Sequence, residues 1–269
     1  MRQPAKKTRP NLGLALSGGS ARGLAHIGVL KVFQEHNIPV DCVAGTSMGS
    51  MVGAFFANGM SVKMIEHLAA RMERRLWMDL TIPRMGIIAG DKITDILCFL
   101  TRKRTFAELE IPFATCATDL YSAKSITLKE GRVADAVRAS ISIPGVFPPV
   151  PWKDYLLVDG GVLNRVPVDV VREMGPDIVV AVDVGHHVGE PRISNFLDVI
   201  VQSIDIMSRE LHKDRVLQAD VLICPHLEEV SPSQFHKVPE AVAAGYAAAR
   251  EALPQIENLL QRKESRNET

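Results

Sequence analysis

Residues 40–58 read VDCVAGTSMGSMVGAFFAN, and this stretch points to the fold class. The short stretch from Val40 to Gly45 predicts a buried strand, and the apolar pattern from Ser47 to Asn58 predicts the helix that follows it. Between them stands a G-x-S-x-G sequence, Gly45 to Gly49, with Ser47 at its centre. A tight strand-to-helix turn needs glycines beside the serine, because side chains there would clash with neighbouring backbone. The pattern therefore predicts Ser47 at a helix N-terminus as a candidate nucleophile, although a serine that only caps the helix would fit the same pattern.

Strand and helix patterns alternate along the rest of the chain. Alternating strands and helices form βαβ units, so the sequence predicts an α/β fold, a three-layer α/β/α sandwich with a mostly parallel central sheet. The other expected strands and helices are the strands Leu12–Ser17, Ile111–Thr118, Tyr155–Val158, Ile178–Asp183 and Val221–Cys224, and the helices Arg22–His36, Asn195–Ala219 and Pro239–Leu260.

No internal repeat or linker divides the 269 residues, which predicts one domain. We expect a flexible basic segment over 1–11, the folded domain over 12–260 and a frayed polar tail over 261–269. No segment resembles a secretory signal or a membrane span, which favours a cytoplasmic protein that touches a membrane, if at all, from one side.

Charge and cysteine content exclude several classes of function. Lys plus Arg and Asp plus Glu both number 31, and aromatic residues make up 5%, so nothing indicates a nucleic-acid partner. The four cysteines, Cys42, Cys98, Cys116 and Cys224, are scattered and form no CxxC pair, which favours reduced thiols over disulfides or zinc ligands.

A second glycine-rich turn, Ser17 to Gly23, also joins a predicted strand to a helix. Paired glycines let successive backbone N–H groups point into one cavity and bind an anion. The turn lacks the Gly-Lys-Ser/Thr ending of a Walker loop, and Ser20 stands where a dinucleotide fingerprint needs glycine. The remaining interpretation is an oxyanion hole. Arg22 could steady the turn or attract a phosphate group, and we favour the structural role.

A serine nucleophile needs a base within hydrogen-bond reach. Asp159 ends an apolar strand and enters a Gly-Gly turn, Gly160 to Gly161, and the carboxyl ends of parallel strands gather at one edge of a sheet. A simple turn aspartate would look the same. His186 and His187 follow another strand, so a Ser47-Asp159-His186 triad also fits the residues.

The combination of motifs resembles the patatin-like phospholipases, particularly the small single-domain bacterial members. The glycine-rich turn ending in Arg22-Gly23, the elbow from Gly45 to Gly49 and the Asp159-Gly160-Gly161 turn occur in the family's order. The similarity continues through residues 139–149, ASISIPGVFPP, and covers Leu12 to Leu227. One departure is Ser20, where the family usually has a third glycine.

The resemblance implies a serine hydrolase of fatty acyl esters that works with a Ser–Asp dyad. Ser47 would be the nucleophile and Asp159 the base, without histidine, while the N–H groups of Gly18, Gly19 and Ser20 would stabilise the oxyanion. No metal or organic cofactor is implied. The alternative is a non-enzymatic partner-binding or regulatory protein on the same fold.

Two apolar segments accompany these motifs. Seven of the ten methionines fall between Met48 and Met85, and the stretch from Met60 to Ile96 mixes helical and irregular pieces. It is either a helical excursion packed on the sheet or a mobile cover over a lipid site. Phe147 to Trp152 is stiffened by prolines and is expected to run as a loop at the active-site edge, with Trp152 suited to contact lipid headgroups.

Overall fold

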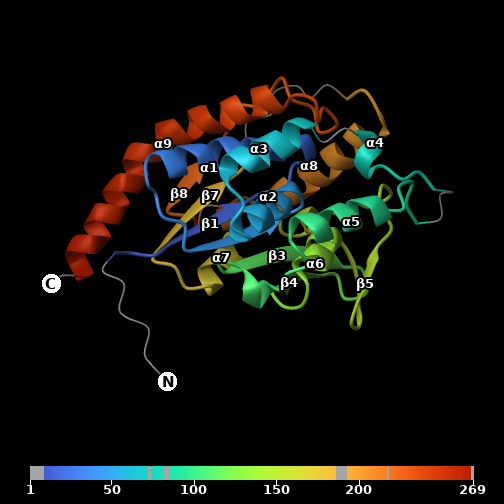
Figure 1. The fold of residues 1–269 in the computed structure, drawn as a ribbon, viewed down its shortest axis with the longest axis horizontal. Coiled ribbons are helices and arrows are strands. Elements are labelled where there is room, and N and C mark those ends of the chain that lie inside the picture. Colours follow the sequence, from blue (N-terminus) through green and yellow to red (C-terminus); the bar gives the residue numbers. More distant parts are fainter. Residues whose placement is uncertain (1–8, 72–73, 82–84, 186–192, 217, 268–269) are drawn as a thin grey trace.

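The computed structural model describes residues 9–71, 74–81, 85–185, 193–216 and 218–267, and in that part of the chain one sheet forms the centre of the fold (Figure 1). Its strands are β1 (Leu12–Leu16), β2 (Cys42–Thr46), β3 (Phe113–Asp119), β4 (Lys124–Leu128), β5 (Val150–Trp152), β6 (Tyr155–Asp159), β7 (Ile178–Val182) and β8 (Val221–Ile223). The strand order is β5-β6-β3-β2-β1-β7-β8, with β4 also paired to β3.

Five strands, β3, β2, β1, β7 and β8, are parallel neighbours, as the alternating pattern predicts. The other three, β4, β5 and β6, pair antiparallel. The α/β class and the central sheet flanked by helices are therefore confirmed, but the sheet is mixed at one end. Neither β4 nor β5 is among the strands expected from the sequence.

The helices are α1 (Ala25–Glu35), α2 (Met48–Ala57), α3 (Val62–Arg71), α4 (Arg74–Trp77), α5 (Asp91–Leu100), α6 (Val133–Ser140), α7 (Val168–Glu173), α8 (Phe196–Val216) and α9 (Val238–Asn267), with the 3-10 turns η1 (Ser20–Leu24), η2 (Phe106–Glu108) and η3 (Gly160–Val162). In Figure 1, α1 and α9 lie together on one side of the sheet and α7 on the other. None of these helices, within the described ranges, is long and apolar enough to cross a membrane.

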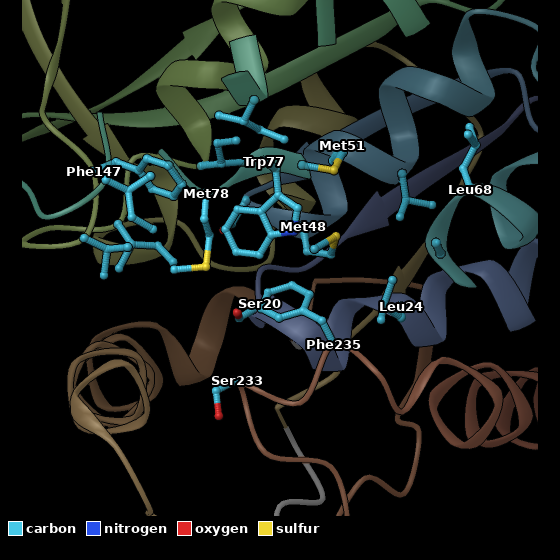
Figure 2. Close-up of a pocket in the computed structure, with 18 of the residues that line it drawn as sticks. Ser20, Leu24, Met48, Met51, Leu68, Trp77, Met78, Phe147, Ser233 and Phe235 are labelled. Atoms are coloured by element: carbon cyan, nitrogen blue, oxygen red, sulfur yellow. The ribbon is translucent and has the colours of Figure 1, made fainter. Parts of the chain in front are cut away.

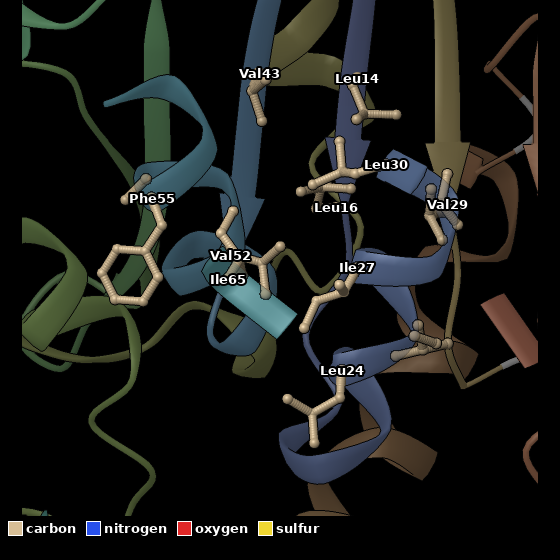
Figure 3. Packing of buried hydrophobic residues seen from close by; sticks show 14 of the residues in the cluster. Leu14, Leu16, Leu24, Ile27, Val29, Leu30, Val43, Val52, Phe55 and Ile65 are labelled. Carbon is tan, nitrogen blue, oxygen red and sulfur yellow. The ribbon is translucent and has the colours of Figure 1, made fainter. Parts of the chain in front are cut away.

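The two faces of the sheet carry side chains of different size. Leu14 and Leu16 of β1 pack with Val43 of β2 and with Ile27 and Val52 of the covering helices (Figure 3). The opposite face is built from small residues such as Ala15, Ala44, Ala114 and Ala181, packed against the valines of α7. Because successive strand residues point to opposite faces, the alternation of Leu with Gly and Ala along β1 sets this asymmetry. It lets α7 pack close to the sheet.

Both ends of the folded unit differ from the sequence expectation. Arg9 forms hydrogen bonds of 2.7 and 3.0 Å with the Asp41 carboxylate, so the boundary at residue 11 is too late. The tail expected to fray continues α9 as far as Asn267, and Lys263 Nζ donates to the carbonyl oxygen of Asp177. The folded part therefore begins earlier, and its last helix ends later, than composition suggested. Arg9 and Lys263 find their partners at Asp41 and Asp177, just before strands β2 and β7.

The methionine-rich segment, Met60 to Ile96, forms α3, α4 and the start of α5 and packs against the main core. The N–H groups of Ile87 and Ile88 donate to the carbonyl oxygen of Val146, at 3.0 and 2.9 Å. The Asp79 carboxylate accepts hydrogen bonds from the first N–H groups of α5. The segment is thus joined to residues 143–148 as a packed excursion; that it moves as a cover remains a prediction.

Residues 147–152 were expected to form a loop, and only part of them does. Val150 to Trp152 form edge strand β5, with Pro151 opposite Leu156, a position where a missing N–H costs no central ladder bond. Phe147 lies at the cavity described below, but Trp152 is half-buried and does not line it. That Trp152 contacts lipid headgroups therefore remains a prediction.

Candidate active site

Ser47 stands on a sharp, strained turn between β2 and α2. Its backbone has φ 52° and ψ −122°, a conformation that non-glycine residues rarely adopt. A Cβ on Gly45 would lie 2.4 Å from the Gly49 carbonyl oxygen, and one on Gly49 would lie 2.2 Å from that of Leu16. Both glycines are therefore required by close backbone packing, as the G-x-S-x-G pattern predicts. The turn presents Ser47 at the start of α2.

The Ser47 hydroxyl donates a 2.6 Å hydrogen bond to Oδ2 of Asp159. Both residues are buried, with 7% and 4% of their surface exposed. The second oxygen of Asp159 accepts a 2.7 Å hydrogen bond from the Gly161 N–H, which fixes the carboxylate from the other side. The structure thus brings together the serine and the aspartate that two separate motifs single out.

The strand geometry explains how the two residues meet, and it differs from the expected one. β2 runs parallel to β3 and pairs as far as Cys116, while β6 runs antiparallel to β3 and ends with Asp159 opposite Ala117. The carboxyl ends of β2 and β6 therefore meet head to head along β3. Asp159 reaches Ser47 in this way, and not from a neighbouring parallel strand.

Burial raises the pKa of Asp159 from 3.8 to about 7. The carboxylate of Asp205 adds to this rise, while the hydrogen bonds from Ser47 and Gly161 oppose it. A carboxyl with this pKa is partly ionised at neutral pH and accepts a proton more readily than an ordinary aspartate. Its environment therefore suits a general base.

Histidine does not contact this pair in the part of the chain that the structure describes. His26 is fully buried, its Nε2 lies 2.8 Å from the Ser17 carbonyl oxygen, and burial lowers its pKa to about 4. It is therefore neutral and holds the glycine-rich turn. His186 and His187, the histidines of the triad alternative, lie outside the described residues, so that alternative stays untested.

The glycine-rich turn lies against Ser47, but one of its expected oxyanion donors is already engaged. The Gly18 N–H donates to the Arg165 carbonyl oxygen at 2.9 Å, so Gly18 anchors the turn instead. A Cβ on Gly18 would lie 3.3 Å from the Ser47 Cβ, so glycine allows the close approach. Among the described residues, no acceptor is found for the N–H groups of Gly19 and Ser20. These two are the donors that remain.

Ser20 has φ 51°, a left-handed conformation that favours glycine. Serine at this position therefore carries backbone strain, and the family's usual glycine would not. Gly23 completes the turn, since a Cβ there would lie 2.5 Å from the Met48 side chain. Gly160 is needed for the same reason, as its Cβ would meet the Cys116 carbonyl oxygen at 2.3 Å.

A buried charged cluster supports the turn from behind. Arg22 is 2% exposed, its Nε donates to the Val230 carbonyl oxygen at 2.9 Å, and its Nη1 lies 3.5 Å from Asp205. This agrees with the structural role favoured for Arg22. Asp183, at the end of an expected strand, forms a buried ion pair with Arg165 at 2.7 Å.

Sequence reasoning missed one residue that positions the nucleophile. The Ser140 hydroxyl, at the end of α6, accepts a 3.0 Å hydrogen bond from the Ser47 N–H. Ser140 is fully buried. It belongs to the stretch 139–149 that carries the family resemblance, but nothing in its sequence context distinguishes it from the neighbouring Ser142.

An apolar cavity of about 360 Å³ opens beside Ser47 (Figure 2). Its size falls in the range of small-molecule sites, roughly 300–1,000 Å³. Among the described residues, its only polar lining side chains are serines and one asparagine, and none is charged. Figure 2 places Leu68 and Phe147 toward opposite sides, with Met48 and Ser20 between them. The remaining apolar walls come mainly from α2, α3, the methionine-rich segment and residues 141–147, and include Met51, Val52, Phe55, Ile65, Ala69, Trp77, Met78, Ile88, Ile143 and Phe235.

No group of three or more His, Cys, Asp or Glu side chains that could hold a metal ion occurs within the described ranges. Of the four cysteines, Cys42 and Cys116 are buried and Cys98 and Cys224 are half-buried.

Comparison with known proteins places these features in a family. A family model described as patatin-like phospholipase matches residues 14–172. Human patatin-like phospholipase domain-containing protein 6 is 34% identical over 186 residues, which cover 66% of this chain and 14% of that protein. An uncharacterized NTE family protein of Mycobacterium bovis is 35% identical over 187 residues, covering 68% of this chain and 52% of the relative.

One further curated relative and one solved structure resemble this chain. The neuropathy target esterase sws of Drosophila melanogaster is 34% identical over 186 residues, covering 66% of this chain and 13% of its own length. The chain thus spans between 13% and 52% of these curated relatives. The crystal structure of VipD from Legionella pneumophila superposes with a TM-score of 0.64 at 15% identity, covering 93% of this chain and 67% of VipD. This last likeness concerns the fold.

Proposed function

Because the chain belongs to the patatin-like phospholipase family, we propose that it is a serine acyl hydrolase that cleaves fatty acyl esters of lipids. The observation that carries this proposal is the 2.6 Å hydrogen bond from Ser47 Oγ to the buried Asp159 carboxylate, at the wall of an apolar cavity. A nucleophile paired with a base and adjoining an apolar cavity is the arrangement that hydrolysis of a lipid ester requires.

The reaction begins when Ser47 Oγ attacks the ester carbonyl carbon and its proton passes to Asp159 Oδ2. Charge develops on the carbonyl oxygen, and the N–H groups of Gly19 and Ser20 stabilise it. Each such preorganised donor contributes about 3–4 kcal/mol to transition-state stabilisation. Asp159 then protonates the departing alcohol, which leaves an acyl group on Ser47. Water releases the fatty acid in a second step, with Asp159 again as base.

The raised pKa of Asp159 makes it a better acceptor for the serine proton than an ordinary aspartate. An aspartate with an ordinary pKa of about 3.9 is a poor acceptor for a serine proton. Burial raises the pKa to about 7, which narrows the mismatch while leaving much of the carboxylate ionised at neutral pH. The hydrogen bonds from the Gly161 N–H to Asp159 and from the Ser47 N–H to Ser140 support the direct contact between Ser47 and Asp159.

The acyl chain occupies the apolar cavity. Burial of each methylene contributes about 0.8 kcal/mol, so a cavity of this size selects for long apolar chains. The absence of charged side chains among its described lining residues matches an acyl chain and disfavours a headgroup there.

We also propose that the protein meets its substrate at a lipid surface and acts in the cytoplasm. Two segments that flank the cavity carry exposed apolar side chains, and we call them the rim: Leu76, Leu80, Met85, Ile193, Phe196 and Val199. Clustered exposed apolar residues at a site's entrance are typical of membrane or partner contact. The four cysteines are scattered along the sequence and form no CxxC pair, a pattern that agrees with a reducing compartment.

The proposal is tested with a labelled fluorophosphonate and a short-chain ester. The unmodified protein should label at Ser47 and hydrolyse the ester. Ser47→Ala should do neither, and Asp159→Asn should lose about 10²–10⁴-fold in kcat/KM while circular dichroism stays unchanged. His186→Ala and His187→Ala should retain most activity. An unlabelled protein without esterase activity would instead support the non-enzymatic alternative, and a large loss in either histidine variant would support the triad.

A further inference from the structure

A second, much smaller cavity adjoins Ser47. It lies between the glycine-rich turn, η3 and α8, and has a volume of about 20 Å³. It shares Ser20, Ser47 and Ile143 with the apolar cavity, so the nucleophile stands where the two cavities meet. Its other lining residues are Gly18, Gly19, Asp159, Gly161, Arg165, Val201, Ile204 and Asp205.

Buried charged residues distinguish this small cavity from the large one. Asp159, Arg165 and Asp205 line it, each no more than 5% exposed. Nη1 of Arg165 has no hydrogen-bond partner within the described part of the chain. A buried guanidinium N–H without a partner is costly unless something else accepts from it. The cavity therefore offers unused hydrogen-bonding capacity beside the reacting serine.

The size of the small cavity limits its occupant. A cavity needs at least roughly 10–15 Å³ on this measure to hold one water molecule, and the water needs two to four polar partners. The volume of about 20 Å³ meets that requirement and leaves no room for an acyl chain or a headgroup. The carboxylates of Asp159 and Asp205 and the Nη1 group of Arg165 provide the partners.

We infer that this small cavity is the site of the water molecule that hydrolyses the acyl-enzyme, an assignment that rests on the proposed acyl hydrolase function. Once Ser47 carries the acyl group, its oxygen has no proton to give, and Asp159 Oδ2 is free to accept one from water. The water oxygen bonds to the acyl carbon as its proton moves to Asp159. The bond from that carbon to Ser47 Oγ then breaks, Ser47 takes the proton back from Asp159, and the fatty acid leaves.

The two cavities hold the acyl chain and the hydrolytic water on different sides of Ser47. The acyl chain stays in the uncharged apolar cavity, and water arrives on the side that carries the base. Ile204 of α8 is the half-buried wall of the water cavity, so a larger side chain there should displace the water without touching the acyl cavity. Ile206, two residues further along the same helix, is 52% exposed and lines neither cavity.

The experiment compares Ile204→Phe with Ile206→Phe and with the unmodified protein. The acyl-enzyme is formed with a p-nitrophenyl ester, and its decay is followed by intact mass spectrometry and by the burst of p-nitrophenolate. Reaction with a fluorophosphonate, which needs no water, measures the nucleophile alone. We expect Ile204→Phe to slow decay of the acyl-enzyme about tenfold or more and to react with the fluorophosphonate at an unchanged rate. Ile206→Phe should behave like the unmodified protein in both measurements.

Equal decay rates of the acyl-enzyme in Ile204→Phe and the unmodified protein would overturn the assignment, as would an equal slowing of labelling and decay. If Ile204→Phe does not fold, Val201→Ile fills the same cavity with a smaller increase in volume, because Val201 lines this cavity and not the apolar one. Failure of the unmodified protein to label or to hydrolyse the ester would instead refute the proposed function. The two failures are therefore distinguishable.

Discussion

Two serines of the site hold strained backbone conformations, and only one of them has a chemical reason to do so. Ser47 has φ 52° because the turn from β2 to α2 must expose its oxygen. Ser20 has φ 51°, yet its expected contribution is a backbone N–H, which glycine supplies equally well. A left-handed conformation costs a non-glycine residue about 1–2 kcal/mol. Strain at Ser20 is thus not required by the proposed chemistry.

We therefore predict that Ser20→Gly keeps kcat for a short-chain ester and keeps or raises the melting temperature. Part of the relieved strain, about 0.4–1 kcal/mol, is offset by the greater freedom of glycine in the unfolded chain. Ser20→Ala is the matched variant, because it removes the hydroxyl and leaves the strain. A large fall of kcat in both variants would show that the Ser20 hydroxyl takes part in the reaction.

Because the pKa of Asp159 is raised, its ionisation should increase activity and decrease stability as the pH rises. We predict that kcat/KM rises with pH through about 7, because Asp159 must be ionised to accept the serine proton. The folded-state pKa lies above the unfolded value, so this group's contribution to stability is full below about 4 and is lost as pH rises through 7. Arg165 and Asp205 line the same small cavity as Asp159, and they are present both in the unmodified protein and in Asp159→Asn.

Asp159→Asn removes that ionisation, so its melting temperature should exceed that of the unmodified protein more at pH 8 than at pH 5. Each unit of pKa shift is worth about 1.4 kcal/mol, so the difference should be on the order of a few kcal/mol. Thermal unfolding of both proteins at the two pH values measures it. An equal difference at both values would mean that Asp159 titrates like an exposed aspartate.

At the scale of elements, α3 supplies one wall of the acyl cavity through Ile65, Leu68 and Ala69. We predict that Ala69→Phe shortens the cavity and lowers kcat/KM for long-chain esters much more than for short ones. Each methylene kept out costs about 0.8 kcal/mol, or roughly fourfold. Ala70→Phe, on the exposed side of the same helix, is the control and should leave the chain-length profile unchanged. Equal losses at all chain lengths in Ala69→Phe would place the acyl chain elsewhere.

The elements that the sequence predicts are those with a strong local pattern. The expected strands at β1, β2, β3 and β7 and the long helix α8 are confirmed within a few residues. The short strands β4 and β5 are not predicted, because β4 is half-exposed and β5 contains a proline, and each depends on pairing with a strand that has the pattern. Pairing between distant segments has no local signal.

In the candidate site, too, local motifs can be recognised in the sequence and contacts between distant segments cannot. The glycines at 45 and 49 and the Asp-Gly-Gly turn are local motifs that single out Ser47 and Asp159 as candidates, and the family resemblance then favours Asp159 over a histidine triad. That Gly18 donates to Arg165, and that Ser140 holds the Ser47 N–H, depends on contacts across 147 and 93 positions of the chain. Three-dimensional structure is needed to find such partners.

At the scale of the whole molecule, the large cavity lies beneath two segments that present apolar side chains outward. Figure 1 shows α4 close to the start of α8, and residues of both segments line the cavity. Leu80 and Ile193 are 75% and 54% exposed, and neither lines the cavity. Exposed apolar residues gathered at the entrance of an apolar site are typical of a surface that binds a membrane or another protein. A lipid surface would cover both segments at once and deliver the acyl chain to Ser47.

We therefore predict that the protein binds zwitterionic phosphatidylcholine vesicles weakly, and that Leu80→Ser combined with Ile193→Ser reduces the binding about tenfold. Burial of one such side chain is worth about 1.5–3 kcal/mol, and partial insertion realises a fraction of that. Vesicle sedimentation measures binding, and hydrolysis of a small soluble ester should not change. Leu120→Ser is the matched control, since Leu120 is 51% exposed on the turn after β3 and lines neither cavity. If Leu120→Ser weakens vesicle binding as much as the rim variant, or if the unmodified protein does not sediment with vesicles, the rim does not dock on lipid.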